Sequence, residues 1–159
     1  MQEMLKLDQQ LKKLPVFLAD IPEVLTAFIF GSYGTSNQTA LSDIDFAVLF
    51  NKKLELKDEA GFLLSLSQFL GTDRVDLVNL NKAPLTLQFR AISQGKIVYE
   101  RDYITTCNFL EKIADLYQDY AIDLNYYYKE YDEALKEAYS RWQTPVTKKI
   151  LMISVCLSK

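Results

Sequence analysis

The sequence predicts an α+β fold, with a small sheet and its helices in residues 1–102 and a long helical region after them. Short apolar runs of strand length recur between residues 24 and 100, which is typical of strands buried in a sheet. Between them lie segments whose apolar residues recur every three or four positions, as in amphipathic helices. From residue 103 to residue 143 neither Gly nor Pro occurs, and only the helical spacing continues.

The first expected element is a helix over residues 2–19, where leucines recur at roughly helical spacing. We expect Pro15 to end or kink it, because proline lacks the backbone N–H that a helix interior needs. Residues 24–30 and 44–50 are then expected as the first two strands. The polar residues between these strands are expected to form a bend.

The second half of the core continues the alternation of helices and strands. Residues 56–70 predict a helix, and Gly71 is suited to the left-handed position just after a helix end. Residues 74–80 are expected as the third strand. Residues 85–93 are expected as a helix that ends before Gly95, and residues 96–100 as a short last strand.

The region after residue 102 predicts one long amphipathic helix, or a helix broken once, over residues 103–142. Unbroken, forty residues would extend roughly 60 Å at 1.5 Å per residue, whereas a domain of this size is about 30–35 Å across. The helix must therefore bend back or meet a partner. Most of the tyrosines lie between residues 99 and 139, and tyrosine is favoured at interfaces. We expect residues 103–143 to be a helical extension packing on the core, on a partner or on both, and residues 144–159 to be a tail or strand.

Composition excludes several classes of function. The net charge is −3, which gives no support to direct, sequence-independent nucleic-acid binding. The chain contains no His, so His-based general base catalysis and His-ligated zinc are excluded. No apolar run is long enough to span a bilayer, and the first residues lack the apolar region of a signal peptide. A cytoplasmic protein without a membrane segment is therefore expected.

Two carboxylates are expected on the same face of the second strand. Asp43 and Asp45 are two residues apart, so their side chains point the same way, while Ile44 and Phe46 point to the opposite face. Neighbouring carboxylates repel each other unless a cation lies between them. Because hard oxygen ligands suit Mg²⁺ completed by a substrate phosphate, this pair predicts a magnesium site.

The first strand ends in Gly31-Ser32, which predicts a phosphate site next to these acids. A turn at this point offers free backbone N–H groups and a hydroxyl, the donors that suit a phosphate. Gly31 would let the phosphate approach the backbone closely.

Gly31-Ser32, ten residues and then Asp43-x-Asp45 resemble the signature of the polymerase-β-like nucleotidyltransferases. The short chain resembles their minimal branch, the MNT-type antitoxins that pair with HEPN toxins. The resemblance implies a core built on a small mixed sheet with helices. It also implies a third carboxylate on a later strand, and Asp76 fits that place. It further implies two Mg²⁺ ions held by Asp43, Asp45 and Asp76, and ATP phosphates held by Gly31 and Ser32.

Four points in this assignment stay open. Ser42, which we include among the nucleotide-binding residues, could instead cap the turn before the acids. Asp76 lies inside an apolar run and is expected to be buried, either binding metal or forming a salt bridge with Arg74. The family often carries a basic residue shortly after Gly-Ser, whereas this chain has Tyr33-Gly34-Thr35, so a phosphate contact from such a side chain is in doubt. A purely structural interpretation makes the two acids a helix cap and a surface charge.

The resemblance implies an antitoxin that transfers AMP from ATP to a tyrosine of a cognate HEPN ribonuclease toxin, in a hetero-oligomer. The tyrosine-rich helix suits such a protein partner. A small-molecule nucleotidyltransferase, such as an aminoglycoside-modifying enzyme, is an alternative. It usually needs a longer second domain to complete the acceptor pocket. A third hypothesis is an antitoxin that acts by binding alone.

Overall fold

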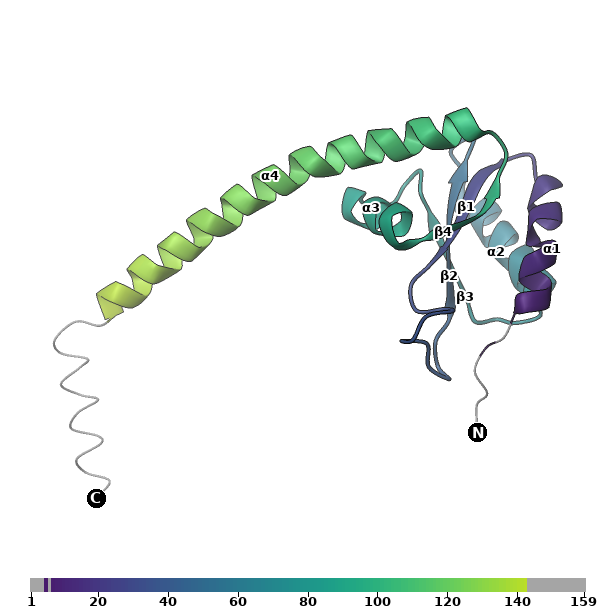
Figure 1. Cartoon of the computed structure of the whole chain (residues 1–159), viewed down its shortest axis with the longest axis horizontal. Coiled ribbons are helices and arrows are strands. Elements are labelled where there is room, and N and C mark those ends of the chain that lie inside the picture. The colour runs from purple at the N-terminus through teal and green to yellow at the C-terminus, as the bar shows by residue number, and fades with distance from the viewer. Residues whose placement is uncertain (1–4, 6, 143–159) are drawn as a thin grey trace, which may run out of the picture. The chain divides into compact units, whose positions relative to one another are not determined.

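The computed structural model describes residue 5 and residues 7–142. The described part of the chain contains four strands and four helices, which confirms the predicted α+β class (Figure 1). In chain order they are α1 Asp8–Ala19, β1 Val24–Phe30, β2 Ile44–Phe50, α2 Leu56–Leu70, β3 Val75–Asn79, α3 Leu85–Gln94, β4 Lys96–Glu100 and α4 Tyr103–Trp142. No helix in this part of the chain is long and apolar enough to cross a membrane.

The strands form one mixed sheet in the order β3-β2-β1-β4. β1 is antiparallel to both of its neighbours, β2 and β4. β2 and β3 are parallel, and parallel neighbours need a crossover connection, which α2 supplies. The crossover brings residues some thirty positions apart in sequence side by side at one end of the sheet.

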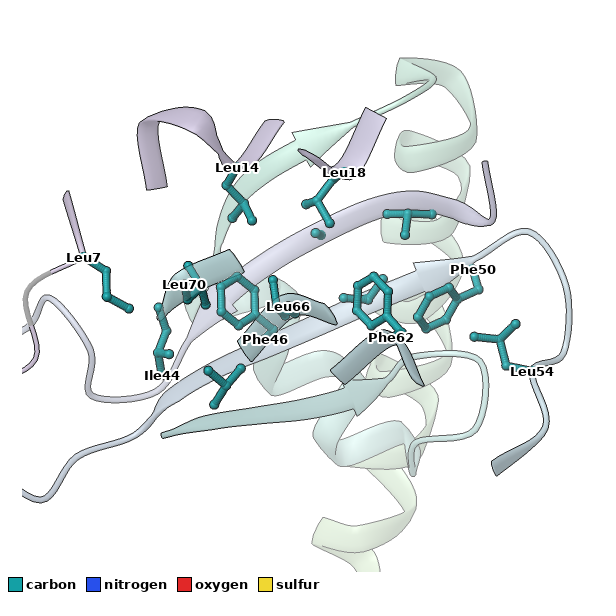
Figure 2. Close-up of a cluster of buried hydrophobic side chains, with 14 residues drawn as sticks. Leu7, Leu14, Leu18, Ile44, Phe46, Phe50, Leu54, Phe62, Leu66 and Leu70 are labelled. Atoms are coloured by element: carbon teal, nitrogen blue, oxygen red, sulfur yellow. The ribbon is translucent and has the colours of Figure 1, made fainter. Parts of the chain in front are cut away.

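Each face of the sheet is covered by helices. On one face, buried side chains of α1 and α2 pack against β1 and β2, as Figure 2 shows for the labelled residues. That cluster includes Leu14, Leu18, Phe46, Phe62, Leu66 and Leu70. On the other face, Phe28, Ala47 and Leu49 pack with residues of α3 and with Phe109 and Leu110 of α4. The residues on β2 therefore alternate between the two layers.

The first helix differs from the expectation. It begins at Asp8, and Leu5 and Leu7 lie outside it; residues 2–4 and 6 lie outside the described residues. Pro15 lies inside the helix, so the prediction that the helix could end there is wrong. Leu14 and Leu18, on either side of Pro15, are fully buried against the sheet. Their packing outweighs the local cost of proline, about 3 kcal/mol in a helix interior.

The other boundaries follow the prediction closely. Gly71 ends α2 in the left-handed conformation, with φ 72°, and its N–H donates to the Ser67 carbonyl at 2.9 Å. The strands β1, β2 and β4 have the expected bounds, and β3 is one residue shorter at each end.

The long helix α4 is unbroken from Tyr103 to Trp142. Residues up to Tyr117 belong to one compact unit and those from Gln118 onward to a second. In the first unit Ile113 is buried, and the Thr106 hydroxyl forms a buried hydrogen bond of 2.7 Å with the Thr26 hydroxyl of β1. In the second unit large apolar and aromatic side chains are exposed. The expected tail over residues 144–159 lies outside the described residues.

Candidate active site

The two acids of the Asp-x-Asp motif lie at the start of β2. Asp43 directly precedes the strand and Asp45 is its second residue. Ile44 and Phe46 are fully buried, while Asp43 is exposed and Asp45 is half-buried. This alternation confirms that the two carboxylates share a face and that their apolar neighbours point into the core.

Asp76 lies beside Asp45. The parallel register pairs Asp45 of β2 with Asp76 of β3, so the α2 crossover brings these two carboxylates together. Asp76 is exposed, so the expectation of a buried carboxylate is wrong. β3 is the outer strand of the sheet, and a side chain on an edge strand keeps contact with water.

Gly31 follows the last residue of β1 and lies directly against Asp45. Its backbone has φ +80°, a conformation that side chains disfavour. A Cβ atom at this position would lie 2.1 Å from Asp45 Oδ2, far inside van der Waals contact. The glycine therefore permits both the turn and the close approach of the carboxylate.

The turn after Gly31 is held by its own polar groups. The Ser32 carbonyl accepts hydrogen bonds from the Thr35 N–H at 3.1 Å and the Thr35 hydroxyl at 2.7 Å. The Gly34 N–H donates to the Gln38 side chain at 2.9 Å. The Gly-Ser turn thus has a fixed shape before any phosphate arrives.

Ser42 closes the next turn. Its hydroxyl accepts a hydrogen bond from the Thr39 N–H at 2.9 Å and lies 3.1 Å from the Thr39 hydroxyl. This is the turn-capping role considered from the sequence. A contact between Ser42 and a nucleotide stays a prediction.

Arg74 is a residue of this site that sequence reasoning considered only as an alternative partner of Asp76. Its Nε donates to Asp43 Oδ1 at 3.4 Å, and its guanidinium also donates to the Ser42 carbonyl. Within residues 7–142 the ion pair of Arg74 is with Asp43, so the alternative pairing with Asp76 is not found there. The strand register explains this pairing. Ile44 pairs with Val75, so the residues directly before them, Asp43 and Arg74, are neighbours.

The surroundings of Asp45 raise its pKa above the ordinary value. Burial raises the pKa of Asp45, and the negative charges of Asp76 and Asp43 raise it further. The positive charge of Arg90 on α3 acts in the opposite direction. Asp45 therefore senses both of the other acids, and the charge of Arg90 offsets their effect and that of burial only in part.

The described residues contain no group of three or more His, Cys, Asp or Glu side chains already arranged as a metal site. Asp43 is engaged with Arg74 instead. The donor set nevertheless fits Mg²⁺, because carboxylate oxygens are its preferred protein ligands. A divalent cation between Asp45 and Asp76 would also remove the repulsion that raises the pKa of Asp45.

A hollow of about 630 Å³ borders the Gly-Ser turn. Its walls come from the start of α1, the end of β1 with the following turn, and the start of β4. Lys12 and Lys96 line it, and Asp8 is its acidic residue. Sequence reasoning missed these two lysines, because they lie far apart in the chain and belong to no motif.

Two proteins with the same name are similar to this chain in sequence. A protein adenylyltransferase MntA from Aphanizomenon flos-aquae is 29% identical over 110 residues, covering 63% of this chain and 73% of the relative. A protein of the same name from Shewanella oneidensis is 36% identical over 77 residues, covering 48% of this chain and 55% of the relative.

Solved structures of toxin–antitoxin complexes are similar as well. One is a toxin–antitoxin crystal structure with AMP-PNP, with TM-score 0.64 and 28% identity, covering 76% of this chain and 96% of that one. Another is a tri-AMPylated Shewanella oneidensis HEPN toxin in complex with an MNT antitoxin, with TM-score 0.62 and 26% identity over 79% and 98% of the two chains.

The family model described as polymerase beta, nucleotidyltransferase matches residues 12–104. This stretch is more than half of the chain and contains the Gly-Ser turn and the three acids. The chain belongs to the polymerase-β nucleotidyltransferase family.

Proposed function

We propose that this protein is a cytoplasmic antitoxin enzyme that transfers AMP from ATP to a tyrosine of its cognate HEPN-type toxin. The observation that carries the proposal is the position of Asp45, opposite Asp76 and against the Gly31 backbone. Acids and a phosphate-binding turn are thereby joined in one place. The names of the relatives, protein adenylyltransferase and tri-AMPylated HEPN toxin with MNT antitoxin, support the choice of AMP and acceptor.

The proposed reaction is an in-line displacement at the α-phosphorus of ATP. The tyrosine oxygen forms a bond to this phosphorus, the bond from the phosphorus to the bridging oxygen breaks, and pyrophosphate leaves. The phenolic proton passes to water. Such a transfer depends on positioning and charge neutralisation, so the absence of His is no obstacle.

Asp43, Asp45 and Asp76 would hold two Mg²⁺ ions in the complex with ATP. The ions supply neutralisation of the triphosphate charge and a lowered pKa of the attacking hydroxyl. Asp45 and Asp76 are already paired across two strands. Asp43 shares one carboxylate oxygen with Arg74, which leaves the other for a metal.

The nucleotide would lie along the Gly-Ser turn. Gly31 and Ser32 supply its phosphate contacts, with Ser42 beside the acids. The hollow on the other flank of the turn carries Lys12 and Lys96, whose charges suit the anionic part of ATP. These lysines would make the phosphate contact of the basic residue that this chain lacks after Gly-Ser.

We assign residues 1–102 to the nucleotidyltransferase core and residues 103–143 to a helical extension, within a hetero-oligomer with the toxin. The core contains every residue named above for metal and nucleotide.

The test is the intact mass of the cognate HEPN protein after co-expression with the wild type or with Asp45→Asn. Asp20→Asn is a matched control, because Asp20 is an exposed acid at the end of α1. We expect a gain of one or more AMP units with the wild type and Asp20→Asn, and none with Asp45→Asn. A stable complex with no gain in any case would favour an antitoxin that acts by binding alone. Neither gain nor complex would favour a small-molecule acceptor.

A further inference from the structure

The negative charge of this chain is concentrated in the second half of α4. Between Gln118 and Ser140 there are six acidic residues and two lysines, a net charge of −4. The whole chain carries −3, so all the remaining residues together carry +1. The distal half of α4 is therefore a strongly acidic helix attached to a nearly neutral protein.

The same half carries a row of four large side chains, of which one is half-buried and three are exposed. We call this row the tyrosine stripe, and it consists of Leu124, Tyr127, Tyr131 and Leu135. Their spacings of three, four and four place them on one side of the helix. Tyr127 and Tyr131 are 60% and 53% exposed, and Leu135 is 39% exposed. The rings of Tyr127 and Tyr131 stack with centroids 6.4 Å apart, so the row is pre-ordered.

An acidic row runs beside the tyrosine stripe. It consists of Asp119, Asp123 and Glu130, which share one side of the helix because their spacings are four and seven residues. All three side chains are exposed. Asp123 and Glu130 lie four residues before and three residues after Tyr127, so they flank it. The surface thus has an aromatic centre and a negatively charged edge, the composition of a protein interface.

The charge restricts what can cover this surface. Nucleic acid and anionic lipid would be repelled. A second copy would bring the same excess of negative charge against it. A stripe with spacings of three and four fits the side of another helix. The occupant must therefore be a protein with a basic helical face.

We propose that the distal half of α4 docks on a positively charged helical face of the cognate HEPN-type toxin. The identity of this partner rests on the proposed function. The docking surface lies outside residues 12–104, the stretch that the family model matches. It therefore adds a means of holding the toxin that is separate from the reacting groups.

The tyrosine stripe is tested with Tyr127→Ala/Tyr131→Ala in the full chain. Asn125→Ala is the control, because Asn125 is exposed and its position on the helix lies off both the stripe and the acidic row. Alanine is the strongest helix former, so α4 is retained, which far-UV circular dichroism verifies. We expect the double variant to bind the co-purified toxin at least about tenfold more weakly by calorimetry, as for buried interface tyrosines. The control should bind like the wild type.

The acidic row is tested with Asp119→Asn/Asp123→Asn/Glu130→Gln. Charges at the edge of an interface act mainly on association, so this variant should bind more slowly at low salt. Its association rate should also depend less on salt than that of the wild type. An unchanged association rate with unchanged salt dependence would show that the acidic row takes no part, and would contradict the basic partner face.

AMP transfer to the toxin is measured in the same samples at saturating toxin, which separates docking from chemistry. Since the stripe variant keeps its acids, it should transfer AMP at the wild-type maximal rate but require more toxin. If the stripe variant loses binding but even the wild type transfers no AMP, docking would be supported and the proposed reaction refuted. Wild-type binding by the stripe variant would overturn docking whatever the transfer. Self-association of the wild type that the stripe variant abolishes, seen by light scattering, would also overturn it in favour of a second copy.

Discussion

Among single residues, Arg74 is the cation nearest to Asp43, at 3.4 Å. Arg74→Gln should lower the stability of the metal-free protein only slightly, by about 0.2–1 kcal/mol, because the pair is partly exposed. It should also increase the gain in melting temperature on adding Mg²⁺, since Asp43 is no longer shared with a guanidinium. Differential scanning fluorimetry with and without Mg²⁺ measures both effects. Arg74→Lys keeps the charge and serves as the control; a smaller Mg²⁺ gain in Arg74→Gln than in the wild type would contradict competition between Arg74 and the metal.

Asp45 makes stability depend on pH. In the unfolded chain its pKa has the ordinary value of 3.8, and folding raises it through burial and the nearby acids. The folded protein therefore binds this proton more tightly, so stability is highest below the ordinary value and falls as pH rises through the raised one. Asp45→Asn should melt higher than the metal-free wild type at pH 7, by about 1–3 °C.

This difference between Asp45→Asn and the wild type should shrink to nothing when thermal unfolding is repeated at acid pH. A variant that melts lower than the metal-free wild type at neutral pH would show that the ionised carboxylate is stabilised by groups other than those described.

Gly31 has both a positive φ and a close contact with Asp45. Substitutions at two other glycines allow the two effects to be measured separately. Gly31→Ala should destabilise by about 1–3 kcal/mol or more, through backbone strain and the clash with Asp45. Gly34→Ala has the same sign of φ but open space, so it reports the strain alone. Gly61→Ala, inside α2 with no neighbour within 4 Å, should be stabilising by up to about 1 kcal/mol. Urea unfolding ranks the three, and equal losses at Gly31 and Gly34 would rule out the contact with Asp45 as a cause.

The sequence predicted the acids on β2 because the alternation of polar and apolar residues determines which face a side chain takes. It placed Asp76 on the right strand but predicted burial, because the position of β3 at the edge of the sheet cannot be read from an apolar run. The alternative it offered, a salt bridge between Arg74 and Asp76, is not found because Arg74 pairs with Asp43 across the strands. Neighbours across strands depend on register, and register comes from packing of the whole sheet.

Among the elements, α4 is joined to β1 by one buried hydrogen bond, between the hydroxyls of Thr26 and Thr106. Thr106→Val should cost about 1–3 kcal/mol, because it leaves the Thr26 hydroxyl buried without this partner. The double variant Thr26→Val/Thr106→Val should lose less than Thr106→Val alone, since no unpaired hydroxyl remains. Chemical denaturation of the two variants measures the difference, and a larger loss in the double variant would contradict this account.

The strands were predictable as elements because their apolar runs are short and bounded by polar turns. The start of α1 and its continuation through Pro15 were not, since local preference there is overruled by burial of Leu14 and Leu18. The strand order also could not be predicted from pattern alone. Four short apolar runs fit many sheets, and the crossover by α2 selects one of them.

For the molecule as a whole, the buried hydrophobic residues of the described chain all lie at or before Ile113. A chain ending after Tyr117 should therefore keep the fold, with a melting temperature within a few degrees of the full chain's. A chain ending after Arg101 lacks Thr106 and Ile113, and it should melt much lower or fail to fold. Thermal unfolding followed by circular dichroism compares the two. Unfolding of the chain that ends after Tyr117 would show that the core depends on residues after Tyr117.

The parallel pairing of β2 with β3 has a consequence for synthesis on the ribosome. The chain is made from its N-terminus, so Asp43 and Asp45 are translated well before Asp76, with α2 between them. Until that helix and the strand after it have emerged and docked, the nascent chain has two of its three acids, and Asp45 has no acid beside it on a neighbouring strand. The three acids proposed for the chemistry are thus complete only once β3 has joined the sheet, and incomplete translation products that stop before β3 lack Asp76.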